Sequence, residues 1–385
     1  MSQYDQCSLN SICGCLHTIN NIDNSICVSL WLTCSELVSC ASPNNMCYAP
    51  DHICVHHPQC YDHPVCYPLS QANQQICPPM ITSSPPLKPS DGICENAIWS
   101  TNGTTVAGSD GLGSALYRLY GPWGLFVDDY QSVYVADSKN HRIVKWIKGA
   151  SSGQLVAGGK GSGNNNDQLN HPSDVIVDSD GTIYISDTEN QRIQQWFQGA
   201  KVGKTIIKDI LSPVGISQDK QGLFYVSDWR KGEVRKWRIG ATTGQLVASR
   251  LGGPRFLFID RNQSIYVAEE RRDRVIKVDD TSATQFSILA GGSLGDGLDQ
   301  LLQPYSVIVD ELGTLYVADT NNHRIMRWTR GAKSGKVIAG GRGIGSRYDQ
   351  LSYPHDLSFD LSGNLYVVDY GNHRVQKFTI DKSLC

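Results

Sequence analysis

A repeated pattern of residues constrains the fold of this chain more than any other feature of its sequence. Each copy contains a proline, an apolar run that ends in Asp, a turn, and a second run that ends in an acid. The closing acids are spaced by 50, 41, 41, 50 and 50 residues, and they are Asp137, Asp187, Asp228, Glu269, Asp319 and Asp369. The prolines that open the copies, from Pro122 to Pro354, have the same spacing. A period of about 40–50 residues is typical of stacked supersecondary units.

One copy, residues 304–340, indicates what each unit forms. Val307–Val309, Leu315–Val317, Arg324–Trp328 and Lys336–Ala339 are short β-rich runs separated by turns rich in Gly, Asn and Asp. Such runs predict a four-stranded antiparallel meander. A sheet of this kind has two apolar faces and needs neighbours on both. The six copies therefore predict an all-β fold, a six-bladed β-propeller.

The two ends of the chain are expected to meet in the last blade. The sixth copy, which starts at Pro354, lacks a fourth strand, and Thr104–Gly108 matches the fourth strand Gln154–Gly158 of the first copy. This predicts that an N-terminal strand closes the ring. Cys94 and Cys385 flank the two partners, so we expect a disulfide between them; two free thiols are the alternative.

The motifs that close the second run resemble a known repeat. Asn140-His-Arg-Ile143, Asn322-His-Arg-Ile325 and Asn372-His-Arg-Val375 each follow a Tyr-Val-(Ala/Val)-Asp and are similar to the NHL repeat. The resemblance covers residues 97–380 and implies a six-bladed propeller. It does not imply one activity, because NHL propellers include RNA- and protein-binding modules, sensor domains and the zinc lyase of peptide amidation.

The recurring polar residues of this motif are interpreted as structural. A histidine found at one position in three blades is not a unique catalytic group. Asp137, Asp319 and Asp369 are expected to accept hydrogen bonds from turn amides or from the arginines that follow them. These arginines are Arg142, Arg324 and Arg374.

Residues 1–77 differ in composition from the rest and are expected to form a separate, irregular disulfide-rich module. Eleven cysteines lie between Cys7 and Cys77, and residues 1–93 carry a net charge of −5. Many cysteines with little core are typical of a disulfide scaffold. Zinc held by cysteines and histidines between Cys54 and Cys66 is the alternative. Residues 78–93 are expected to be a proline-rich linker, and residues 94–385 the propeller.

Disulfides predict an extracellular or secretory-lumen location, although the first residues contain no signal peptide. The sequons at Asn102 and Asn262 fall in predicted turns, where glycosylation occurs. No apolar run approaches the length needed to span a membrane.

A ligand site is expected at the mouth of the propeller channel, on the face that we call the top face. This face carries the connections from fourth to first strands and from second to third strands. Residues just after the six prolines converge there, and such convergence around a concavity marks a ligand site. The candidates are Trp123, Asp174, Arg255, Tyr305, His355 and Asp356. The alternative is that the aromatic rings only plug the channel.

An enzyme of the amidating-lyase type is a second hypothesis. The resemblance to this lyase implies zinc-binding histidines at this same position, in Pro-His-(Ser/Asp)-(Leu/Ile) motifs. Pro354-His-Asp-Leu357 fits that motif. The other five copies have Trp123, Ser173, Val214, Arg255 and Tyr305 there. Catalytic zinc requires about three protein ligands, so His355 alone is a weak metal candidate. Calcium held by Asp174 and Asp356 is also weak, and no cofactor is expected.

The third and fourth copies depart from the pattern. They lack the Gly-rich connector before the proline, and residues 228–277 contain twelve basic and six acidic residues. An open, basic notch with Trp229, Arg271 and Arg272 is expected to suit an anionic partner, which is an acidic protein, a glycan or a nucleic acid. Ordinary variation in surface turns is the alternative.

The sequence therefore favours a non-catalytic extracellular scaffold that binds a protein or glycan through its top face. A metal-dependent lyase or hydrolase and an RNA-binding module are the alternatives.

Overall fold

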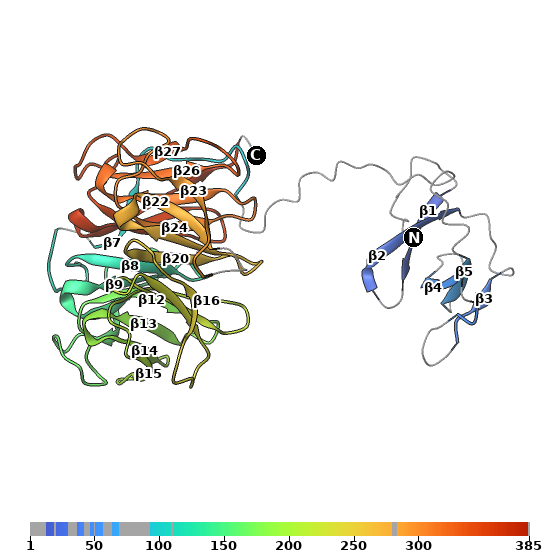
Figure 1. Ribbon diagram of the computed structural model, residues 1–385, viewed down its shortest axis with the longest axis horizontal. Helices are drawn as coiled ribbons and strands as arrows, with labels where there is room; N and C mark the ends of the chain where they lie inside the picture. Colours follow the sequence, from blue (N-terminus) through green and yellow to red (C-terminus); the bar gives the residue numbers. More distant parts are fainter. Residues whose placement is uncertain are drawn as a thin grey trace. The chain divides into compact units, whose positions relative to one another are not determined.

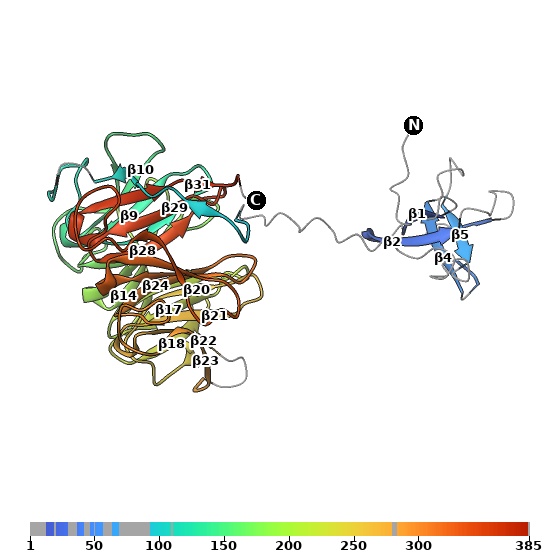
Figure 2. The ribbon, with the colours of Figure 1, turned by 90° about the horizontal axis from the view of Figure 1, so that it is seen from above.

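The chain divides into two compact units, Met1–Leu87 and Lys88–Cys385 (Figures 1 and 2). The computed structural model describes residues 13–18, 21–29, 37–41, 47–49, 51–56, 64–68, 93–108, 111–278 and 283–383. Of the predicted linker, residues 78–93, only Ile93 lies within this part, and it is fully buried in the core of the second unit. No helix in the described part is long and apolar enough to cross a membrane.

The first unit contains a five-stranded antiparallel sheet in the order β2-β1-β4-β5-β3. Its strands are β1 (Cys13–Thr18), β2 (Asn21–Ser29), β3 (Val38–Ser39), β4 (His52–His56) and β5 (Val65–Pro68). Disulfides join Cys40 to Cys54 and Cys47 to Cys66. The expected disulfide framework is thus present among the described residues, while the sheet was not foreseen.

The second unit contains six four-stranded sheets, which we number as blades 1 to 6. The strands of blades 1 to 3 are β8 (Pro122–Val127), β9 (Val133–Asp137), β10 (Arg142–Trp146), β11 (Gln154–Gly158); β12 (Pro172–Val177), β13 (Ile183–Asp187), β14 (Arg192–Trp196), β15 (Lys204–Lys208); and β16 (Pro213–Gln218), β17 (Phe224–Asp228), β18 (Glu233–Trp237), β19 (Gln245–Ala248). Those of blades 4 to 6 are β20 (Pro254–Ile259), β21 (Ile265–Glu269), β22 (Arg274–Val278), β23 (Phe286–Gly291); β24 (Pro304–Val309), β25 (Leu315–Asp319), β26 (Arg324–Trp328), β27 (Lys336–Gly340); and β28 (Pro354–Phe359), β29 (Leu365–Asp369), β30 (Arg374–Phe378), β7 (Thr104–Ala107).

The first strands of the blades form a closed ring. Each contacts the first strand of the next blade, and β28 of blade 6 contacts β8 of blade 1. In every blade the second strand is buried along its whole length, because the neighbouring sheets cover both of its faces. The repeat thus folds as a β-propeller, as expected.

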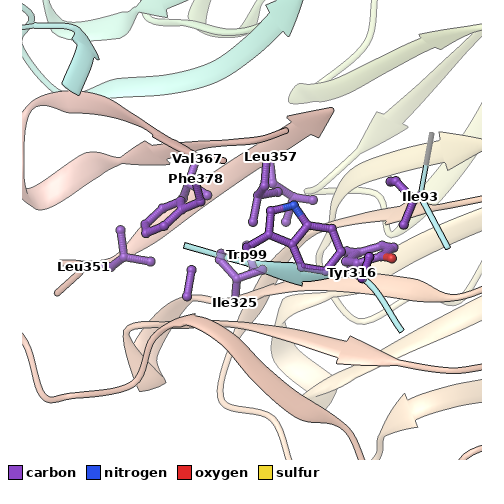
Figure 3. Packing of buried hydrophobic residues seen from close by; sticks show 12 residues of the cluster. Ile93, Trp99, Tyr316, Ile325, Leu351, Leu357, Val367 and Phe378 are labelled. Atoms are coloured by element: carbon purple, nitrogen blue, oxygen red, sulfur yellow. The ribbon is translucent and has the colours of Figure 1, made fainter. Parts of the chain in front are cut away.

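The N-terminal part of this unit closes blade 6, as predicted. Strand β7 pairs with β30, and Ala107 lies opposite Val375. Just upstream, β6 (Ile98–Trp99) pairs with β31 (Ile380–Asp381). Trp99 packs edge-on against Tyr316 and donates a 3.0 Å hydrogen bond from Nε1 to the carbonyl of Gly363. Figure 3 shows this ring within the core formed by blades 5 and 6.

The acid that closes each second strand holds the top of its blade together. In blade 1, Asp137 Oδ1 accepts a 2.7 Å hydrogen bond from the Tyr120 amide, and Oδ2 accepts one of 2.7 Å from Arg142 Nε. Arg142 also donates to the Ser114 carbonyl in the preceding connector. The equivalent acids of blades 2, 5 and 6 pair with Arg192, Arg324 and Arg374. The structural interpretation of these residues is confirmed.

The recurring histidine links blades 1, 5 and 6 to the blade that follows each of them. It follows the 3₁₀ turns η3 (Ser138–Asn140), η6 (Thr320–Asn322) and η7 (Tyr370–Asn372), while Gln191 follows η4 (Thr188–Asn190) and Asp273 follows η5 (Glu270–Arg272). Nδ1 of His141 and of His323 accepts the amide of the residue before the next proline, His171 and Tyr353, at 3.2 and 3.1 Å. His373 accepts the Gly121 amide of blade 1 at 3.3 Å.

Candidate functional site

Four of the predicted ligand residues lie against one another at the start of the first strands. The Arg255 guanidinium lies 5.6 Å from the centroid of the Trp123 ring and 4.4 Å from that of Tyr305. The His355 ring is 5.0 Å from Trp123 and 4.7 Å from Tyr305, centroid to centroid. These four residues from blades 1, 4, 5 and 6 form what we call the channel-mouth cluster.

Arg255 is held in place by Glu270, which the sequence interpretation missed, and by Tyr305. The Glu270 carboxylate accepts a 2.8 Å hydrogen bond from Arg255 Nε and a 2.6 Å hydrogen bond from Trp229 Nε1. Arg255 Nη2 donates to the Tyr305 hydroxyl at 3.3 Å. Because its charge is matched by Glu270, this buried arginine is a rigid wall of the site rather than a free cation.

A second missed residue, Tyr370, completes the cluster. Its ring stacks on His355 with centroids 4.0 Å apart and an angle of 11° between the planes. Tyr370 and Glu270 both come directly after the acid that closes a second strand. Trp229, which the sequence interpretation did name, holds the same place in blade 3, so the position after each closing acid was the signal that could have found Glu270 and Tyr370.

Two buried nitrogen atoms of the cluster have no hydrogen-bond partner in the structure, Trp123 Nε1 and His355 Nδ1. Burial, and secondarily the charge of Arg255, lowers the pKa of His355 well below its ordinary value. The imidazole is therefore neutral at physiological pH. An unpaired buried polar group costs about 1–3 kcal/mol, so these atoms mark a place where a ligand atom or a water would be stabilised.

A pocket of about 440 Å³ opens beside the cluster. Trp123, Trp229 and Arg255 form part of its wall, and Ser173, Thr188 and Asn170 add hydroxyl and amide groups. Its size lies within the range of roughly 300–1,000 Å³ that is usual for small-molecule sites. Two larger hollows, of about 750 and 910 Å³, lie elsewhere, one lined by β6 and β27 and one by turns of blades 4 and 5. Neither is lined by residues of the channel-mouth cluster.

Asp174 and Asp356 are buried in the ring of first strands, where they link blades. Asp174 accepts the amides of Val175 and Ile216, the latter in blade 3. Asp356 accepts the amide of Leu125 in blade 1 and the hydroxyl of Ser306 in blade 5. Burial and the nearby charge of Asp356 raise the pKa of Asp174 well above its ordinary value. Burial raises the pKa of Asp356 to about 6.

These contacts leave the two carboxylates unsuited to a calcium ion, because their oxygens already accept N–H and O–H donors. A zinc site also lacks its ligand set. The residues around His355 are Trp123, Tyr305 and Tyr370, and none supplies a second nitrogen ligand. In the first unit, the sulfurs of Cys40, Cys47 and Cys66 lie within 4.8 Å of one another. All three are in disulfides, so they are not the thiolates that a metal needs.

Trp229, Arg271 and Arg272 lie in the second-to-third-strand turns of blades 3 and 4. The Arg271 guanidinium lies 4.1 Å from the centroid of the Trp229 ring, and that of Arg255 lies 5.0 Å from it. Arg272 pairs with the buried Glu269 at 3.1 Å. The predicted basic residues thus adjoin the channel-mouth cluster through Trp229.

Three further predictions concern covalent modification. Cys94 is disulfide-bonded, but its predicted partner Cys385 lies outside the described residues, so that pairing stays a prediction. Asn102 and Asn262 are both exposed. Asn262 lines the hollow between blades 4 and 5, away from the channel-mouth cluster. A glycan at either sequon stays a prediction.

Comparison with known proteins agrees with this architecture. The NHL repeat family matches at residues 119–146, 169–196 and 351–378, within blades 1, 2 and 6. No curated protein is significantly similar to the chain in sequence.

Several solved structures share the fold. A protein of unknown function from Bacteroides thetaiotaomicron has a TM-score of 0.60 at 16% identity, covering 74% of this chain and 76% of that one. An auxiliary nutrient binding protein from Bacteroides ovatus has a TM-score of 0.58 at 16% identity, with coverage of 73% and 77%. A catalytically inactive virginiamycin B lyase from Staphylococcus aureus, solved with quinupristin, has a TM-score of 0.50 at 11% identity, with coverage of 74% and 99%. These likenesses concern the fold alone. The chain therefore contains three segments that match the NHL repeat, within a unit that folds as a β-propeller, and its N-terminal region is rich in cysteine.

Proposed function

We propose that the chain is a non-catalytic binding scaffold that takes its ligand at the channel mouth of the top face. One observation carries this proposal. The pocket of about 440 Å³ is bounded by rigid aromatic rings and Arg255, next to two buried nitrogens without partners, Trp123 Nε1 and His355 Nδ1. A few convergent polar groups on an aromatic wall suit recognition of a ligand.

The chemistry of the cluster favours binding over catalysis. A catalytic metal would need further protein ligands near His355, and an acid–base pair would need a free carboxylate to orient the imidazole. Glu270 is paired with Arg255, and the oxygens of Asp174 and Asp356 are occupied by donors from neighbouring blades. The ligand is a protein or a glycan, met outside the cell or in the secretory lumen. The two disulfides of the first unit and the exposed sequons support that location.

The test is a native mass spectrum of the full chain, produced in a secretory host without chelator. We expect the wild type to carry no metal. The mass of the His355→Ala variant should then differ from that of the wild type only by the substitution itself. The competing hypothesis is a lyase-like enzyme. One stoichiometric zinc that disappears in His355→Ala would overturn the binding proposal in favour of that enzyme.

A further inference from the structure

The top face is less covered at blades 3 and 4 than at the other blades. Before blades 1, 2, 5 and 6, long connectors fold back on themselves through bridges such as Leu112 to Leu119 and Ile344 to Leu351. Before blades 3 and 4, the chain crosses from β15 to β16 and from β19 to β20 within a few residues. The turns of blades 3 and 4 beside these short crossings therefore have no such connector over them.

These turns and crossings present five exposed cations, which we call the basic rim. They are Arg230, Lys231, Arg250, Arg271 and Arg272. Of the five, only Arg272 forms an ion pair within the described part of the chain.

The acids near the basic rim do not neutralise it. Glu270 is engaged by Arg255, and Asp273 accepts the Gln303 amide at 2.9 Å. Asp228 and Glu269 are buried and accept the amides of Leu211 and Gly252 in the short crossings. Asp209 and Glu189 are exposed, and Glu189 lines the pocket. Because residues 228–277 contain twelve basic and six acidic residues, an excess of positive charge remains over blades 3 and 4, and it attracts anions.

The basic rim is continuous with the pocket through Trp229 and Arg230, which both line it. Trp229 is fixed by its hydrogen bond to Glu270 and by the guanidinium of Arg271. The indole rings of Trp123 and Trp229 offer flat apolar surfaces, and the Asn170 side chain adds an amide. The Ser173 and Thr188 hydroxyls already donate to the carbonyls of Val214 and Pro213, so toward a ligand they act as acceptors.

A sugar ring suits such a pocket, because it has apolar C–H faces and polar edges. Single-stranded RNA would instead need several stacking platforms in succession. The charged side chains of an acidic peptide are acyclic and offer no such flat C–H face to the two indole rings. Charge and pocket chemistry together therefore favour a sugar that carries anionic groups.

We propose that the ligand is an acidic oligosaccharide, in which one sugar ring enters the pocket and carboxylate or sulfate groups contact the basic rim. This inference rests on the proposed function, since it names the chemical class that the channel mouth binds.

The experiment is calorimetric titration of the full chain with a heparin hexasaccharide at low and high salt. Cellohexaose is the neutral control, and decaglutamate and decauridylate are the competing polyanions. The test variant is Arg230→Ala/Lys231→Ala, whose exposed side chains form no ion pair in the described structure. The matched control is Lys201→Ala/Arg238→Ala, which removes the same charges from exposed turns between third and fourth strands, on the opposite face.

We expect one heparin hexasaccharide per chain, with a Kd that the test variant weakens by about tenfold and that rises with salt. The control variant should bind as the wild type does, and cellohexaose, decaglutamate and decauridylate should bind more weakly. Equal losses in the two variants, or tighter binding of decaglutamate or of decauridylate, would overturn the inference.

Glu189→Trp separates the two proposals, because residue 189 is exposed and lines the pocket, which the larger side chain would fill. If Glu189→Trp abolishes binding while Arg230→Ala/Lys231→Ala does not, the ligand binds at the channel mouth without the basic rim. In that case the inference fails and the proposed function stands. If no oligosaccharide binds, the inference fails, and the mass spectrum alone decides the proposed function.

Discussion

The histidine of the repeat acts as a hydrogen-bond acceptor, which requires a neutral imidazole. Burial lowers the pKa of His141, His323 and His373 from the ordinary value. Between the lowered pKa of these histidines in the folded state and a pH of about 6.5, the folded state therefore binds fewer protons than the unfolded state. The stability that these residues contribute is present above this window and is lost as the pH falls through it.

Replacing one histidine by aspartate tests this account. In blade 4 the same position is Asp273, which accepts the Gln303 amide with a similar left-handed backbone, φ 49° against 53° for His323. An aspartate keeps the acceptor and stays ionised from pH 7.5 to 5.5. We expect His323→Asp to match the wild type at pH 7.5 and to lose less free energy of unfolding on acidification. Urea denaturation at three pH values measures this.

The comparison is between variants because other groups titrate in the same range. Asp356, with a pKa near 6, has a raised folded-state pKa and opposes the histidines, since it favours folding as the pH falls. It is common to both proteins and cancels in the difference. Parallel pH profiles for His323→Asp and the wild type would contradict the acceptor role.

At the scale of the element, each long connector is held by an arginine that is buried in blades 1, 2 and 5 and partly buried in blade 6. Arg192 pairs with Asp187 and donates to the carbonyls of Asn164 and Asn165. Without it, the Asp187 carboxylate would remain buried with no cationic partner.

We expect Arg192→Ala to lower the free energy of unfolding by about 3–5 kcal/mol, as breaking a buried ion pair does. Blade 3 supplies the control, because Arg235 pairs with Glu233 where both side chains are partly exposed. Arg235→Ala should cost about 0–1 kcal/mol. Chemical denaturation of both variants gives the comparison, and similar losses would argue against the anchoring role of Arg192.

At the scale of the molecule, closure of the ring depends on a strand that lies far in sequence from the other three strands of blade 6. Strand β7 supplies the outer edge of blade 6, whose other three strands come from the C-terminal end. Without β7, the edge of β30 is exposed, and such edges pair with other chains.

Two truncations test this dependence. A chain without residues 1–92 keeps β6 and β7 and should be a stable monomer. A chain without residues 1–110 should associate or unfold at a lower temperature. Light scattering after gel filtration and thermal unfolding distinguish them. A monomeric, equally stable shorter chain would show that β7 is dispensable.

The sequence predicts the propeller because its signals are local and repeated, from the prolines to the closing acids. It also places Trp123, Arg255, Tyr305 and His355 together, since equivalent positions on ring-forming strands must meet. It does not reveal that Asp174 and Asp356 reach across to neighbouring blades, because that depends on side-chain direction. The sheet of the first unit was not predicted for a different reason: its strands range from two to nine residues and follow no repeat.

The uneven use of connectors has a consequence for redesign of this protein. Four blades use the Asp–Arg pair at the top to hold a long connector, so a loop inserted there would displace an anchored segment. Blades 3 and 4 have only short crossings at that place. A foreign peptide grafted between Arg230 and Lys231 would disturb no such anchor, which makes this turn the natural point at which to give the scaffold a new specificity.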